Sequence, residues 1–148
     1  MELTMDKIAI VRIRGIRNMK PDIKKTLELL RLSRPHHCVV MDASPQTMGM
    51  VKLAQDYLTF GKISESTLSS LLIKRGENGS KKASEVSKES ELAAHAKSII
   101  AGKKVGEFVD PVFRLHPPRK GYKNIKLHFP QGDLGERTNM DDLLKRMM

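Results

Sequence analysis

The feature that most constrains the fold of this chain is the order of its first three segments. A β-branched run is followed by a helical segment and then by a second apolar run. The run KIAIVRIR, from Lys7 to Arg14, is typical of a strand. Pro21 to Leu32 carries apolar residues at helical spacing, and proline suits a first helical turn. Cys38 to Met41 (CVVM) is apolar and short enough for a buried second strand. This order predicts a split β-α-β opening of a small sheet.

The remaining patterns add helices and one strand. We predict helices at Met48 to Phe60, Ser64 to Lys74 and Glu91 to Ala101, with a last helix after Asn139 and a strand at Val112 to His116. Residues 77–90 form a polar Ser/Lys/Glu mixture without clear periodicity. The order predicts an α+β fold in which helices cover one face of a small sheet.

The length of 148 residues suits one domain, and an apolar share of 39% is enough for a lean core. We expect three parts within it. Residues 1–61 supply a βαβα unit and residues 62–110 a helical insertion. Residues 111–148 then supply the third strand, a basic loop and a C-terminal helix.

Charge and cysteine content restrict the class of partner. The net charge of +10 favours an anionic partner, most often a nucleic acid. The single cysteine excludes a disulfide framework and a multi-cysteine metal site, and it fits a reducing, cytoplasmic setting. We find no apolar run of membrane-spanning length and no signal-peptide pattern, so we expect no membrane association.

No acidic residue occurs between Asp110 and Asp133, where the sequence is PVFRLHPPRKGYKNIKLHFPQG. Prolines and glycines keep much of this stretch out of a helix. Its arginines and lysines could replace the counterions of a phosphate backbone, and its aromatic rings could lie against bases or riboses. The alternative is a solvated loop that lacks acids. The composition favours RNA binding over that alternative.

The candidate groups for catalysis have simpler explanations. His36, His37 and Cys38 could suggest a metal site, but adjacent strand residues point to opposite faces and a further ligand is missing. A strand entry with exposed histidines and a buried thiol explains them better. Asp141 and Asp142 fit a helix N-terminus. We therefore predict no enzyme activity, no catalytic or metal-ligating residue, no cofactor and no small-molecule substrate.

Several segments resemble one ribosomal family in collinear order. RIRGIRNMKPDIKKTLELLRL resembles the opening of the large-subunit protein L-thirty family in its long archaeal form, whose eukaryotic counterpart is L-seven. YLTFG, from Tyr57 to Gly61, is similar to the aromatic-glycine ending of that family's second helix. LIKRG, LHPPRKGY, HFPQGDLGER and DDLLKRMM also match in order and spacing. Where relatives commonly have Arg-Gly-Gly, this chain has Arg119, Lys120 and Gly121.

The resemblance implies a ferredoxin-like βαβαβ core with an insertion before the last strand. It also implies a structural constituent of the large subunit of the cytoplasmic ribosome that binds ribosomal RNA, approaches 5S RNA and contacts neighbouring ribosomal proteins. Two alternatives remain, namely a free-standing regulator that binds messenger RNA and, less favoured, an RNA-processing enzyme.

We expect RNA contacts through phosphate and shape, with arginines forking onto phosphates and lysines acting as point charges. Tyr122 either stacks on a base or pins the basic loop to the core. The predicted RNA-binding residues are Arg12, Arg14, Arg17, Lys20, Lys25, Arg34, Arg114, Arg119, Lys120, Tyr122, Lys123, Lys126 and His128.

Overall fold

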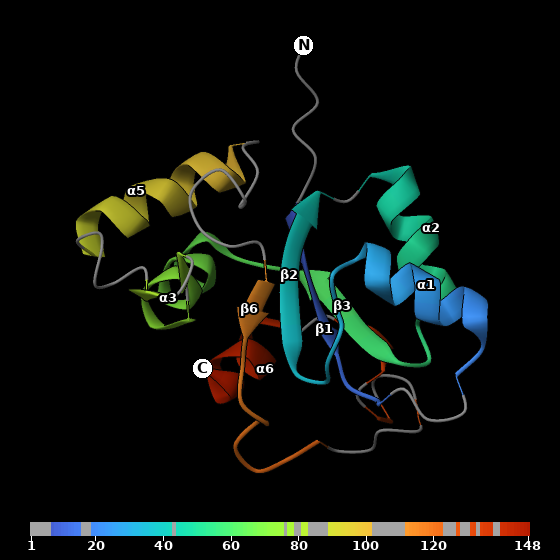
Figure 1. The fold of residues 1–148 in the computed structure, drawn as a ribbon. Helices are drawn as coiled ribbons and strands as arrows, with labels where there is room; N and C mark the ends of the chain where they lie inside the picture. The colour runs from blue at the N-terminus through green and yellow to red at the C-terminus, as the bar shows by residue number, and fades with distance from the viewer. Residues whose placement is uncertain are drawn as a thin grey trace.

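The protein is described by a computed structural model (Figure 1). The residues that it describes are 7–15, 19–42, 44–75, 77–78, 81–82, 89–101, 112–122, 127, 131–132, 134–137 and 140–148.

A five-stranded sheet forms the centre of the fold, with the strand order β6-β2-β1-β3-β7. The strands are β1 (Lys7–Arg12), β2 (His37–Asp42), β3 (Leu58–Lys62), β6 (Val112–Arg114) and β7 (Gly135–Glu136). The central strand β1 is antiparallel to both β2 and β3, and β6 is antiparallel to β2. Only the short β7 is parallel to its neighbour, β3. The predicted α+β class with a largely antiparallel sheet is therefore confirmed.

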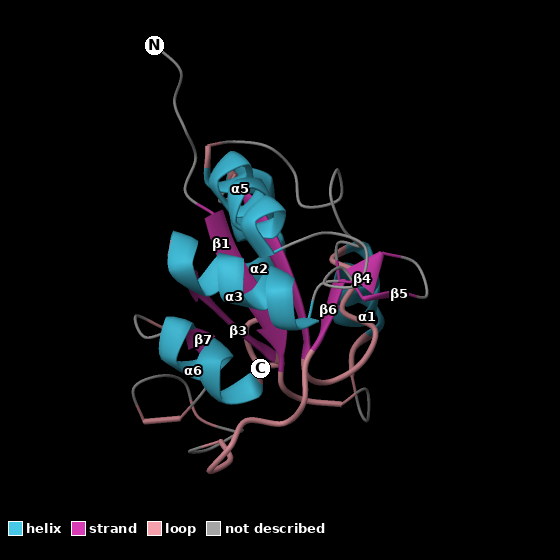
Figure 2. Ribbon diagram, turned by 90° about the vertical axis from the view of Figure 1, so that its left-hand side faces the viewer, coloured by secondary structure: helices cyan, strands magenta, loops and turns pink. Residues whose placement is uncertain are grey.

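Helices cover both faces of this sheet (Figures 1 and 2). One layer holds α1 (Pro21–Leu29) and α2 (Pro45–Leu53); the other holds α3 (Glu65–Arg75), α5 (Glu89–Ile100) and α6 (Met140–Met147). Ile8 and Ile10 of β1 pack under the first layer, and Ala9 and Val11 pack under the second. The expectation of a sheet covered on one face was wrong, because β1 carries apolar residues at successive positions and is buried on both sides.

The core has the βαβαβ order that the family resemblance implied, β1-α1-β2-α2-β3. The split β-α-β opening was wrong, because β1 and β2 are direct antiparallel neighbours, with Ile10 opposite Val39. The third core strand is β3 and not residues 112–116, where the sequence predicts it. That segment forms β6 at the outer edge of β2. The three-part division of the chain stays a prediction, and β3 crosses its first boundary.

The second helix lies earlier than predicted. It begins at Pro45, and Ser44 caps it by accepting a hydrogen bond from the Thr47 N–H at 3.2 Å. It ends at Leu53, and the following Leu58–Lys62 segment pairs with β1. The prediction of a helix to Phe60 was wrong, because Thr59 and Phe60 have high β propensity and the pairing with β1 determines their conformation.

Other predicted elements agree with the structure to within a few residues. The helix α1 ends at Leu29, and α3 begins after Ser64, whose hydroxyl accepts the Thr67 N–H at 3.3 Å. The predicted N-cap Asn139 lies outside the described residues. So do most of residues 77–90, apart from the antiparallel pair β4 (Glu77–Asn78) and β5 (Lys81–Lys82) and the first two residues of α5. Within the described ranges, no helix combines the length and the apolarity that a membrane span requires.

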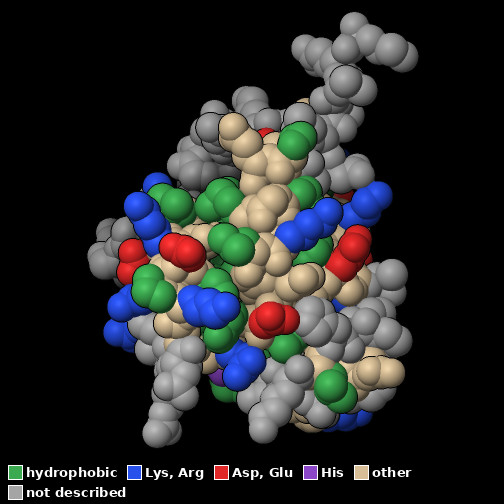
Figure 3. Space-filling view, turned by 90° about the vertical axis from the view of Figure 1, so that its right-hand side faces the viewer, with side chains coloured by type: hydrophobic (Ala, Val, Ile, Leu, Met, Phe, Trp, Pro, Cys, Tyr) green, Lys and Arg blue, Asp and Glu red, His purple; other side chains and the backbone are tan. Residues whose placement is uncertain are grey.

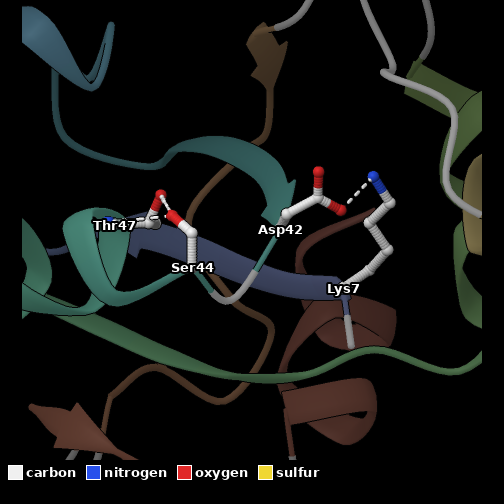
Figure 4. A network of polar contacts seen from close by, with 4 residues as sticks. All are labelled: Lys7, Asp42, Ser44 and Thr47. Carbon is white, nitrogen blue, oxygen red and sulfur yellow. Dashed lines mark hydrogen bonds and ion pairs between the residues drawn. The ribbon is translucent and has the colours of Figure 1, made fainter. Parts of the chain in front are cut away.

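An ion pair joins β1 and β2 at the end of the sheet where β1 begins. Lys7 and Asp42 are opposite each other on β1 and β2, and the Lys7 ammonium contacts the Asp42 carboxylate (Figure 4). The Lys7 side chain is buried, so this carboxylate offsets part of the cost of removing its charge from water. At the opposite end of the sheet, where β1 ends, basic residues predominate.

Candidate nucleic-acid interface

The strand register brings basic residues together where β1 ends and β2 begins. Val11 of β1 is opposite Cys38, and His37 at the start of β2 is opposite Arg114 at the end of β6. Arg12 is the last residue of β1. Arg34 lies in the turn before β2, where its carbonyl accepts the His37 N–H at 3.4 Å. We call the group of Arg12, Arg34, His37 and Arg114 the basic sheet end.

The electrostatic environment of His37 shows that these cations converge. Burial lowers the pKa of His37, and the positive charges of Arg114, Arg34, Arg12 and then His36 lower it further. The imidazole is therefore neutral at pH 7, and the field around it is positive. Such a concentration of fixed positive charge on a folded surface is suited to an anion.

Arg12 was predicted as an RNA contact, and the structure gives it an internal role. Its side chain is 3% exposed. Its Nη1 donates to the Leu32 carbonyl at 2.8 Å, and its Nε donates to the Arg14 carbonyl at 2.9 Å. Arg12 thereby ties the segment after α1 to the end of β1, while its charge still adds to the local field. A direct contact of Arg12 with RNA stays a prediction.

Arg14 lies just beyond β1 and is partly exposed. Its guanidinium carbon is 5.2 Å from the centroid of the Tyr57 ring, and its backbone N–H donates to the Tyr57 carbonyl at 3.1 Å. A guanidinium over an aromatic face is a favourable cation–π arrangement that leaves its charge available to a partner. Arg14 thus has a defined orientation at the same end of the sheet.

The sequence PPRKGY turns sharply after β6. The Gly121 N–H donates to the Pro118 carbonyl at 3.0 Å, and we call residues 118–121 the basic turn. Lys120 has φ of +68°, the left-handed conformation that glycine adopts at lowest cost. A glycine, which the family resemblance implies at this position, would adopt this conformation without strain. Both Arg119 and Lys120 are exposed.

The C-terminal helix holds the basic turn in place. The Arg119 N–H donates to the Arg146 carbonyl at 3.0 Å, and Nη1 of Arg146 donates back to the Gly121 carbonyl at 3.2 Å. Three residues before Arg119, the His116 N–H donates to the Met147 carbonyl at 3.3 Å. Residues 116–121 are therefore anchored to α6.

Tyr122 contacts His36 on the other side of the basic turn. The two rings are nearly parallel, at 12°, with centroids 5.8 Å apart. The Tyr122 hydroxyl and Nδ1 of His36 are 2.8 Å apart and share a hydrogen bond. Of the two roles considered for Tyr122, the pinning of the loop is the one for which these contacts provide evidence.

The other predicted residues fall in different places. Lys20 precedes α1 and Lys25 lies within it, and both are exposed. Figure 3 shows the side of α1 and α2, where apolar, basic and acidic side chains are interspersed; Leu29 is 65% exposed. The groups that act on His37 do not include these lysines. Arg17, Lys123, Lys126 and His128 lie outside the described residues.

Sequence reasoning missed His36, His37 and Arg146 as parts of this site. The sequence predicts the two histidines to be exposed residues at a strand entry and not metal ligands, and gives them no role in RNA binding. Across the described part of the chain, no group of three His, Cys, Asp or Glu is placed to hold a metal ion. The predicted burial of Cys38 is confirmed, and this burial raises the pKa of its thiol to about 12.

Comparisons with known proteins agree with the resemblance. The family described as Ribosomal protein L30p/L7e matches residues 8–58. The large ribosomal subunit protein uL30 of Archaeoglobus fulgidus is 43% identical over 136 residues, which cover 86% of this chain and 90% of that protein. The uL30 proteins of Methanococcus maripaludis and Methanobrevibacter smithii are 42% and 39% identical over 95% and 94% of this chain, and over 98% of each relative.

Proposed function

Because the chain belongs to the uL30 family of large ribosomal subunit proteins, we propose that its basic sheet end and basic turn bind ribosomal RNA through phosphates and shape. The relatives carry the names of ribosomal proteins and not of enzymes, in agreement with the predicted lack of enzyme activity. As a large-subunit protein, the chain is a constituent of the cytoplasmic ribosome.

The convergence of cations around His37 is the observation that carries the proposal. Arg34, Arg114 and Arg12 all act on this one imidazole, although they come from different parts of the sequence. A folded RNA presents closely spaced phosphates, and fixed cations that replace condensed counterions gain affinity from their release. Arginine suits such a site because its planar fork matches phosphate oxygens. The basic turn adds Arg119 and Lys120 to the same surface.

The partners in this proposal are large-subunit ribosomal RNA, with 5S RNA as a further candidate, and neighbouring ribosomal proteins. The arrangement favours recognition by phosphate and shape over reading of base edges, since duplex RNA hides its major groove. A free-standing regulator of messenger RNA is the alternative. It would bind an isolated single strand as well as it binds folded ribosomal RNA.

A double variant of the basic turn tests the proposal. Arg119→Ala with Lys120→Gly removes two charges, and the glycine fits the φ of +68° without strain. Binding to a large-subunit RNA fragment would be measured across a range of salt concentrations. We expect the slope of log K against log salt to flatten by roughly one to two phosphate equivalents.

The matched control is Lys97→Gln in α5, an exposed residue on a helix that lies at the upper left of Figure 1, away from the basic turn. We expect the control to keep the wild-type slope. An unchanged slope in the double variant would show that the basic turn does not contact the RNA phosphates.

A further inference from the structure

His36 connects the two basic segments of the proposed interface. It lies between Arg34 and His37 at the sheet end, and its ring contacts Tyr122 directly after the basic turn. These segments are 86 residues apart in the sequence. The stacked, hydrogen-bonded ring pair therefore joins the surface around Arg34 and Arg114 to the surface around Arg119 and Lys120.

The backbone of His36 is held in an uncommon conformation. Its φ is +69°, which a residue with a side chain adopts at a cost. The His36 N–H donates to the Arg12 carbonyl at 2.7 Å, and this bond fixes the turn at the end of β1. Strain of this kind persists where surrounding contacts define it, and it is concentrated at functional sites. Here the conformation accompanies the contact of the ring with Tyr122.

We propose that His36 is a positioning residue for RNA binding, whose contact with Tyr122 fixes the basic turn beside the basic sheet end before RNA arrives. This inference rests on the proposed function. The hydrogen bonds to Arg146 hold the turn against α6, and the ring pair holds it against the sheet. A surface formed in advance avoids the entropic cost of ordering the turn at the moment of binding.

The test uses His36→Gly and Tyr122→Phe in the full chain. Glycine suits φ of +69°, so His36→Gly keeps the turn and removes the ring. Burial and the nearby charge of His116 lower the pKa of His36, so at pH 7.5 the substitution removes no positive charge. We expect His36→Gly to weaken binding to the RNA fragment roughly tenfold at every salt concentration, with an unchanged salt slope.

Tyr122→Phe keeps the ring and loses the hydroxyl, so we expect a smaller loss, about threefold. Its matched control is Tyr57→Phe, since Tyr57 is the only other tyrosine and contacts Arg14 through its ring. Tyr57→Phe is expected to bind like the wild type.

A second measurement on His36→Gly needs no RNA. In the free protein, the Arg119 and Gly121 amides should exchange with solvent faster in His36→Gly than in the wild type, while the melting temperature stays at the wild-type value.

The outcomes separate this inference from the proposed function. Wild-type affinity or unchanged amide exchange in His36→Gly would overturn the positioning role. A reduced salt slope in that variant would also overturn it, because a phosphate contact would then have been lost. If the wild type itself binds the fragment without salt dependence, the proposed function fails instead.

Discussion

A Gly61→Ala variant is expected to lose roughly 2–3 kcal/mol of unfolding free energy, because the new methyl group enters a contact between backbones. A Cβ at Gly61 would clash with the Arg137 carbonyl oxygen and lie 3.1 Å from the Cβ of Met140. The Arg137 carbonyl cannot move aside easily, since the Arg137 N–H donates to the Phe60 carbonyl at 2.9 Å.

The loss of stability in Gly61→Ala involves more than the contact with the Arg137 carbonyl. Thr59 and Phe60 pair with β7, and Thr59 donates its hydroxyl to the Gly135 carbonyl at 2.9 Å. Met140 is the first residue of α6 and belongs to the same buried cluster as Leu143. A methyl group at Gly61 must therefore displace both β7 and the helix that anchors the basic turn.

Gly49→Ala is the matched control for this variant. Gly49 lies in α2, is exposed, and has no atom within 4 Å of an added Cβ. Alanine in a helix is favoured over glycine, so this variant should gain roughly 0.5–1 kcal/mol. Urea denaturation of both variants measures the two effects. Equal midpoints for Gly61→Ala and the wild type would contradict the close packing of β3 against the Arg137 segment.

Arg34→Gln with Arg114→Gln is expected to have the largest effect on RNA binding. The two arginines flank His37, and each is proposed to hold a phosphate. Loss of two such contacts should flatten the salt slope by roughly 1.4–1.8, which corresponds to roughly a 30-fold loss of affinity near 0.1 M salt. Binding isotherms over a salt series measure both quantities, and Lys97→Gln again serves as the control.

The same variant has a readout that does not need RNA. Since Arg114 and Arg34 lower the pKa of His37 in the free protein, their removal should raise that pKa toward its ordinary value near 6.5. An NMR titration of the His37 ring measures the shift. An unchanged His37 pKa would contradict the geometry of the basic sheet end, whereas a raised pKa with unchanged RNA affinity would contradict only its function.

Local patterns predicted the elements whose conformation depends on their own residues. This holds for Lys7 to Arg12 and for Pro21 to Leu29, since a β-branched run and a proline at the first helical position are local signals. The segment Leu58–Lys62 follows a helix without a clear break in the pattern, and its conformation comes from pairing with β1. The two-residue β7 was not predicted, because so short a strand depends entirely on its neighbour β3.

The composition of the site was partly predictable, and its geometry was not. Arg34, Arg114 and Arg119 were candidates because of their charge and their place near turns. The position of Arg114 opposite His37 depends on the strand register between β2 and β6, which no local signal reveals. The positive φ values of Lys120 and His36 were not predicted, because neither residue type marks a left-handed conformation in the sequence.

Crosslinking of the protein to RNA in assembled large subunits tests the central claim most directly. Ultraviolet irradiation, digestion and peptide mapping would locate the contacted residues. We expect crosslinked peptides from residues 31–37 and 112–122, which contain the basic turn and all of the basic sheet end except the buried Arg12, and none from the exposed face of α5. Crosslinks confined to α5, or to the face formed by α1 and α2, would contradict the account.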